Sequence, residues 1–242
     1  MSDRKDELAA NLARVEERIA AACKAAGRDR DEVTLIVITK TYPASDVRLL
    51  AELGVTHVGE NRDQEAAPKA AECADAGLTW HFVGQLQTNK ARHVAAYADY
   101  VHSVDRVRLV TSLAAGAARE ERELGVLLQV ALDKEGMTAE EAAGRGGVAP
   151  EGVAELADAV AAADGLRLDG LMTVAPLSGP YAGRQQQAFR RLVEISSGLR
   201  AAHPGASMVS AGMSGDLEEA VAAGATHVRV GSAVLGVRPR LR

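Results

Sequence analysis

Aromatic side chains are scarce in this sequence, which has one tryptophan, four tyrosines and two phenylalanines among its 242 residues. Hydrophobic residues still make up 47% of the chain, so alanine, valine and leucine must fill its core. The scarcity also argues against the interleaved aromatic and basic residues that stack nucleic-acid bases. A net charge of −5 argues against a nucleic acid or an anionic membrane as the main partner.

Cysteine is rarer still, since the chain has only Cys23 and Cys73, and neither belongs to a CxxC motif. Such cysteines are typical of reduced packing thiols in a cytoplasmic protein. The charged amino-terminal segment lacks the apolar stretch of a signal peptide, and no apolar run approaches the ~20 residues that span a bilayer. The histidines show no metal-ligand spacing, so we predict no metal site.

An amphipathic helix opens the chain, and eight apolar runs with strand-like composition follow it, most of them separated by segments with helical periodicity. The runs begin near Thr34, Thr56, Trp80, Tyr100, Val126, Leu168, Ser207 and Thr226. Strands that alternate with helices form parallel sheets, and eight such units in ~250 residues favour a closed (β/α)8 TIM barrel. The alternative is a doubly wound open sheet, which prefers a glycine-rich turn where this chain has "ITKTYPAS".

We therefore expect residues 1–242 to form a single barrel domain with an additional amino-terminal helix. That helix could cover the bottom of the barrel in a monomer or pair with another chain, so a monomer and a weak dimer both stay open. The glycine-rich residues 133–150 are expected to form the loop after the fifth strand. They fit a surface insertion and a lid equally well.

The first strand ends on a lysine, although the residues before it are apolar or β-branched. Alternation places Ile36, Ile38 and Lys40 on one face of this strand. In a barrel the carboxyl ends of the strands build the active site. A lysine there loses hydration, which favours the neutral amine that attacks a carbonyl to form a Schiff base. The alternative is an ordinary solvated lysine.

A second pattern lies near the carboxyl end of the sequence, where "GMSGDLEEA" reads as a turn that leads into a helix. We predict Ser214 as the N-cap of this helix, next to Met213, with Gly231 and Ser232 of "VRVGS" beside them. Exposed N–H groups at helix starts bind anions, and barrels often hold phosphate after strands seven and eight. A reactive lysine and a phosphate site together suggest pyridoxal 5′-phosphate (PLP).

Arg229 shares a strand face with Gly231 and is predicted to point into the barrel. Buried arginine is rare unless it is paired, and guanidinium can only donate hydrogen bonds. Beside a pyridine nitrogen it would keep that nitrogen unprotonated, which makes the ring a weak electron sink. The alternative is an ion pair with a carboxylate such as Asp216 or Asp105.

Several motifs in this order resemble the YggS/PROSC family of PLP homeostasis proteins, whose barrel is similar to the alanine racemase N-terminal domain. They are "ITKTYP", "HVGENRDQEAAPK", "WHFVGQLQTNKAR", "VHSVDR", "GLMTVAP", "GMSGDLEEAVAAGATHVRVG" and "LGVR". The resemblance implies that Lys40 carries PLP covalently and that Arg229 meets the pyridine nitrogen. It also implies phosphate contacts from Ser214, Gly231 and Ser232. Asn61 and His81 would line the pocket.

A PLP-dependent racemase needs an acid/base group on each face of the cofactor. In related racemases one of the two comes from an additional β domain, whereas the eight units expected here extend to about Gly236. The leading hypothesis is therefore a PLP carrier without robust turnover, which passes the cofactor to PLP-dependent apo-enzymes. One alternative is a small PLP-dependent amino-acid racemase or lyase. Another is a class I aldolase, which would leave Arg229 without a role.

Overall fold

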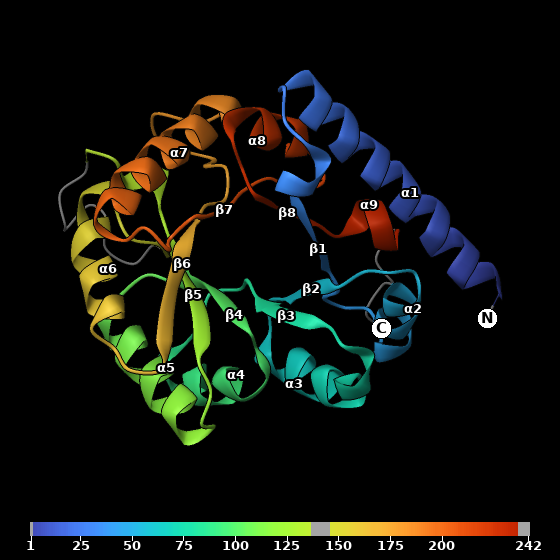
Figure 1. The fold of residues 1–242 in the computed structure, drawn as a ribbon, viewed down its shortest axis with the longest axis horizontal. Helices are drawn as coiled ribbons and strands as arrows, with labels where there is room; N and C mark the ends of the chain where they lie inside the picture. Colours follow the sequence, from blue (N-terminus) through green and yellow to red (C-terminus); the bar gives the residue numbers. More distant parts are fainter. Residues whose placement is uncertain (1, 137–145, 237–242) are drawn as a thin grey trace.

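The structure, a computed structural model that describes residues 2–136 and 146–236, contains a closed barrel of parallel strands (Figure 1). The strands follow one another around the barrel in chain order, and β8 pairs with β1. They are β1 (Thr34–Ile38), β2 (His57–Glu60), β3 (Thr79–Phe82), β4 (Tyr100–Val104), β5 (Leu124–Gln129), β6 (Leu166–Met172), β7 (Met208–Ser210) and β8 (His227–Val230). The predicted (β/α)8 barrel is confirmed, and each strand starts within two residues of its predicted position.

Helices surround this barrel (Figure 1). The α-helices are α1 (Ser2–Ala25), α2 (Ala44–Glu52), α3 (Asp63–Glu72), α4 (Ala91–Tyr97), α5 (Val107–Arg119), α6 (Val153–Ala161), α7 (Gln185–Ala202), α8 (Leu217–Ala223) and α9 (Ser232–Leu235). Short 3-10 turns are η1 (Arg30–Glu32), η2 (Ala74–Ala76), η3 (Thr88–Lys90), η4 (Leu132–Lys134) and η5 (Pro150–Gly152). Among the helices that the structure describes, none has the length and apolar character needed to cross a membrane.

The additional helix α1 lies on the outside of the barrel beside α8 and α9 (Figure 1). Its buried stripe, which includes Leu8, Val15 and Ile19, packs into the core shared with β8, β1 and α2. Asn11 Nδ2 also donates to the Val234 carbonyl of α9 at 2.9 Å. Because α8 and α9 follow β7 and β8, α1 holds in place the helices that flank one side of the barrel mouth.

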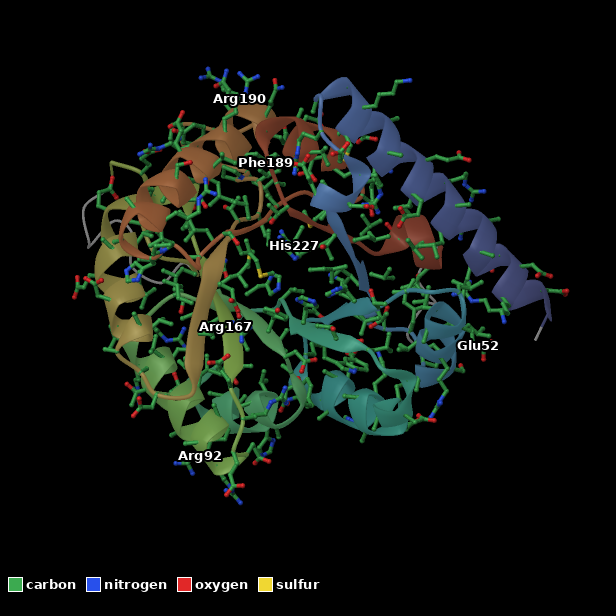
Figure 2. The ribbon with its side chains drawn as sticks, in the orientation of Figure 1. Glu52, Arg92, Arg167, Phe189, Arg190 and His227 are labelled. Carbon is green, nitrogen blue, oxygen red and sulfur yellow. The ribbon has the colours of Figure 1, made fainter. Side chains whose placement is uncertain are left out.

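The apolar core lies mostly between the strands and the helices, whereas the barrel interior contains polar side chains. Val37, for example, packs outward among residues of α1, α2 and α8. His81, His102 and Arg229 are buried instead among the strands, with exposed fractions of 1%, 0% and 4%. Figure 2 shows the side chain of His227 within the ring of strands. Buried polar groups need partners, so this interior must be organised by hydrogen bonds.

Candidate functional site

A cavity of about 370 Å³ opens at the carboxyl ends of the strands, within the size range of small-molecule sites. Seven of the eight residues predicted from the sequence line it, namely Lys40, Asn61, Met213, Ser214, Arg229, Gly231 and Ser232. They come from the ends of β1, β2, β7 and β8. The barrel therefore gathers residues that are up to 192 positions apart in the chain, as counted from Lys40 to Ser232.

Lys40 lies just beyond β1, and the backbone on both sides of it is bound to α3. The carbonyl of Thr39 accepts a hydrogen bond from Lys69 Nζ at 2.9 Å, and the N–H of Thr41 donates to Glu65 Oε2 at 3.0 Å. Thr41 has a φ of +70°, a left-handed conformation that is unusual for threonine. Such strain persists where surrounding contacts hold it and is concentrated at functional sites. These contacts fix the base of the Lys40 side chain.

A buried ion pair ties the ends of β1 and β2 together beneath α3. Glu60 Oε1 lies 2.5 Å from Lys69 Nζ and accepts the hydroxyl of Thr39 at 2.6 Å. Burial raises the pKa of Glu60, and the hydrogen bonds from Lys69 and Thr39 oppose that rise. Since Glu60 directly precedes Asn61, this pair holds the strand ends that present Lys40 and Asn61 in one arrangement.

Asn61 and Gly84 mark a close approach of the loops after β2 and β3. A Cβ atom at Gly84 would lie 2.2 Å from the carbonyl oxygen of Asn61, so only glycine fits there. The Asn61 side-chain oxygen Oδ1 is shielded from solvent and has no hydrogen-bond partner among the described residues. A buried acceptor of this kind needs a partner, which a bound molecule in the cavity can supply.

Backbone donors gather on the opposite side of the cavity, after β7 and β8. The N–H groups of Ser214 and Gly215 make no backbone hydrogen bond within the described chain, and the first N–H groups of α9 at Ser232 have no intrahelical partner. The sequence pattern predicts Ser214 as the N-cap of α8, and this detail is wrong. Asp216 occupies that position but makes no side-chain capping bond. Its Oδ1 instead accepts the N–H of Met213 at 2.6 Å and closes the turn before the helix. Ser214 instead stays in the turn that lines the cavity.

Arg229 points inward as predicted, but its partners are neutral. Its Nη1 donates to the hydroxyl of Ser210 at 2.6 Å, and its Nη2 donates to the carbonyl of Thr173 at 2.8 Å. Within the described residues it forms no ion pair, so neither Asp216 nor Asp105 plays the role considered from the sequence. Burial lowers the pKa of Arg229 to about 10, and the charge of Asp216 acts in the opposite direction.

His81 is the predicted site residue that lies elsewhere. It is on β3 as expected, but it is buried below the cavity, where Nε2 contacts His57 Nδ1 at 2.9 Å and Nδ1 contacts His102 Nε2 at 2.8 Å. No motif or spacing in the sequence indicates that His102 and Ser210 belong to the same network. Their only signal is that each occupies an inward position of a predicted strand. The possible lid falls largely on residues 137–145, outside the described residues.

Comparison with known proteins identifies the family to which this barrel belongs. Residues 7–239 match the family described as alanine racemase, N-terminal domain. Alanine racemase from Corynebacterium glutamicum shares the fold, with a TM-score of 0.63 and 16% identity, and the alignment covers 98% of this chain and 63% of that one.

Other relatives are closer in sequence. The pyridoxal phosphate homeostasis protein of Mycobacterium bovis is 43% identical over 259 residues, covering 99% of this chain and 96% of that protein. The Escherichia coli protein of the same name is 37% identical, with 96% and 97% covered. PipY of Synechococcus elongatus, solved with PLP bound, has a TM-score of 0.78 and 33% identity, with 95% and 100% covered. The chain therefore belongs to the pyridoxal phosphate homeostasis proteins, as the motif resemblance implied.

Proposed function

We propose that this protein binds PLP reversibly in the mouth cavity, holds it as a Schiff base on Lys40, and delivers it to PLP-dependent apo-enzymes in the cytoplasm. The observation that carries the proposal is the meeting of one lysine and several unpaired backbone donors in one cavity. The names of the relatives support it, and so does the PLP bound to PipY.

The residues of the cavity fit the separate parts of this cofactor. Lys40 supplies the amine for the aldehyde. The N–H groups of Ser214 and Gly215, in the turn before α8, and those at the start of α9 suit a phosphate because they are backbone donors that face the same cavity. Asn61 offers a buried acceptor that lacks a partner. When bound, PLP supplies a reactive aldehyde and an aromatic ring that can accept electrons.

The charges of the cavity favour a carrier over an enzyme. Among the described lining residues, only Lys40 and Arg229 have titratable side chains. Arg229 only donates, so it would keep a pyridine nitrogen unprotonated and weaken the ring as an electron sink. A racemase also needs a second acid/base group across the cofactor plane, and the described lining offers none. A class I aldolase would need neither the phosphate donors nor Arg229.

The linkage to Lys40 is tested by reconstituting the protein with PLP, reducing it with borohydride and mapping the modified peptide. We expect absorbance typical of a pyridoxal imine and a single modified lysine, Lys40. Lys40→Ala should remove the imine absorbance while leaving circular dichroism unchanged. Lys90→Ala, which removes another lysine near the barrel mouth, is the matched control and should retain it. Modification of Lys90 or Lys69 instead of Lys40 would refute the assignment.

The carrier role is tested by mixing the loaded protein with a PLP-dependent apo-enzyme and following recovery of that enzyme's activity. We expect transfer, with negligible racemase, transaminase or decarboxylase turnover by the carrier itself. A kcat of ~1 s⁻¹ or more on any amino acid, which lies within the usual enzyme range, would establish the alternative of a small racemase or lyase.

A further inference from the structure

A continuous row of hydrogen-bonded side chains runs through the barrel interior and ends at Arg229. From Arg229 Nη1 it passes to Ser210 Oγ at 2.6 Å, and from Ser210 to His102 Nδ1 at 3.0 Å. It continues from His102 Nε2 to His81 Nδ1 at 2.8 Å, and from His81 Nε2 to His57 Nδ1 at 2.9 Å. The row links the floor of the mouth cavity to a second cavity that His57 lines beside α1 and η1.

The direction of this row follows from which groups can donate. Arg229 only donates, so the oxygen of Ser210 must accept from it. Within the described residues the Ser210 hydroxyl has one other partner, Nδ1 of His102, and a buried hydroxyl proton is satisfied only by donating there. His102 then carries its proton on Nε2 and donates to His81. By the same step His81 carries its proton on Nε2 and donates to His57.

The hydrogen bonds of the row require that the imidazole rings be neutral, and burial favours the neutral form of each ring. A doubly protonated His81 would turn its Nδ1–H toward the Nε2–H of His102, 2.8 Å away. A doubly protonated His102 would turn its Nδ1–H toward the Ser210 hydroxyl, 3.0 Å away, which would then have no acceptor for its own proton. Burial lowers the pKa of both side chains well below their ordinary range, and neighbouring histidines lower it further. For His102 the charge of Arg229 acts in the same direction. Parallel stacking of His81 on Tyr100, with ring centroids 4.8 Å apart, also holds its ring plane.

We propose that His102 and His81 are positioning residues, which act through Ser210 to hold the Arg229 guanidinium at the floor of the cavity. Every hydrogen bond of the row points away from Arg229. The row thus anchors the arginine with neutral groups and places no negative charge in contact with it, so its positive charge can act on whatever occupies the cavity. A carboxylate in the position of Ser210 would anchor it equally well but would cancel that charge.

The effect on cofactor binding rests on the proposed function, whereas the row itself can be tested in ligand-free protein. Long-range ¹H–¹⁵N correlation spectra of the imidazoles distinguish the two tautomers of each neutral histidine. Near neutral pH we expect His57, His81 and His102 as neutral rings protonated on Nε2. A ring of His81 or His102 protonated on Nδ1, or on both nitrogens, would overturn the proposal without any variant having to fold.

Ser210→Ala should interrupt the row at its first link. We expect His102 to lose its single tautomer in the same spectra, because its Nδ1 no longer has a donor. The dissociation constant for PLP should rise about tenfold, comparable with the loss of one hydrogen bond to a charged group. Ser210→Thr, which restores the hydroxyl, should recover both properties.

Ser196→Ala is the matched control, because Ser196 is a buried serine on α7 whose hydroxyl has no partner among the described residues. It should change neither the tautomers nor the affinity. If Ser210→Ala left the His102 tautomer unchanged, or if Ser196→Ala weakened PLP as much as Ser210→Ala does, the positioning role would be refuted. Failure of the proposed function would look different, since imine absorbance would then be missing from the wild-type protein.

Discussion

The interior of the barrel and its mouth are both polar, but their polar groups are satisfied in opposite ways. In the interior each member of the row from Arg229 to His57 is hydrogen-bonded to the next. At the mouth, Asn61 Oδ1 and the N–H groups of Ser214 and Gly215 lack such partners within the described chain. The interior therefore fixes geometry, whereas the mouth keeps binding capacity for a ligand. Arg229 belongs to both regions and joins them.

This difference implies that substitutions in the two regions should have separable consequences. Replacing a saturated buried group leaves its partner unsatisfied and lowers the free energy of unfolding. Replacing an unpaired group at the mouth should change ligand binding with little effect on stability, since surface substitutions usually stay within ~0.5 kcal/mol.

The largest expected effect on stability comes from the pair of Glu60 and Lys69, which is buried like the interior. Glu60 Oε1 is bonded to Lys69 and Thr39, whereas Glu60 Oε2 has no partner among the described residues. Lys69→Met removes the cation and leaves the carboxyl group buried beside Thr39. We expect the free energy of unfolding in urea to fall by ~3 kcal/mol, the lower end of the range for breaking a buried pair. Lys5→Met is the matched control, because it breaks an exposed pair with Glu52 and should cost at most ~1 kcal/mol. Similar losses for the two variants would show that burial of the Glu60–Lys69 pair adds nothing to its contribution to stability.

The mouth was largely predictable from the sequence, because it depends on local features. Lys40, Asn61 and Arg229 each lie at or near the end of an apolar run, and parallel strands bring such ends to one edge. One local detail was wrong. The turn before α8 is closed by Asp216 through the N–H of Met213, so Ser214 is released from capping. The sequence shows several side chains there that can cap. In the structure the N-cap residue, Asp216, turns its carboxylate to the N–H of Met213 and makes no side-chain capping bond to α8.

The interior row was not predictable, because it depends on how neighbouring strands are aligned. His81 pairs in register with Gly59 on β2 and with Tyr100 on β4. His57 and His102 therefore lie two residues before and after those partners, on the same face as His81. Alternation within one strand predicts which residues face inward, but not which of them meet across strands. Spacing along the chain excluded a metal motif and gave no reason to group these histidines.

The next effect concerns the mouth alone. Ser214→Asp places a negative charge beside the backbone donors that we assign to the phosphate. The dissociation constant for PLP should rise at least ~10-fold, about 1.4 kcal/mol, while that for pyridoxal, which lacks the phosphate, changes little. Stability should stay within ~0.5 kcal/mol. Ser197→Asp adds the same charge at an exposed position of α7 and should affect neither ligand. Equal losses for PLP and pyridoxal would mean that Ser214 does not contact the phosphate.

The smallest effect is a change in how stability depends on pH, and it comes from His227 in the interior. Burial lowers the pKa of His227 to about 4, and the nearby His57 and Arg229 contribute in the same direction. Its Nδ1 lies 2.8 Å from the Thr226 hydroxyl, and Figure 2 shows the ring inside the barrel. The unfolded chain titrates near 6.5, so between about pH 6.5 and 4 it binds a proton that the folded protein excludes. Stability is therefore lost as the pH falls through this window.

In His227→Asn the unfolded chain no longer binds this proton, so the variant should lose less stability on acidification than the wild type. Between pH 6.5 and 5.5 the difference should be ~1 kcal/mol, as expected for one histidine that is mostly protonated only when unfolded. Urea unfolding at a series of pH values measures it, and the comparison of slopes is insensitive to any constant loss from the substitution itself. His203→Asn, which removes an imidazole beside Asp158 at the end of α7, should not reproduce the change. Parallel curves for His227→Asn and the wild type would show that folded His227 accepts a proton as readily as the unfolded chain does. The barrel interior would then be no more closed to charge than its mouth.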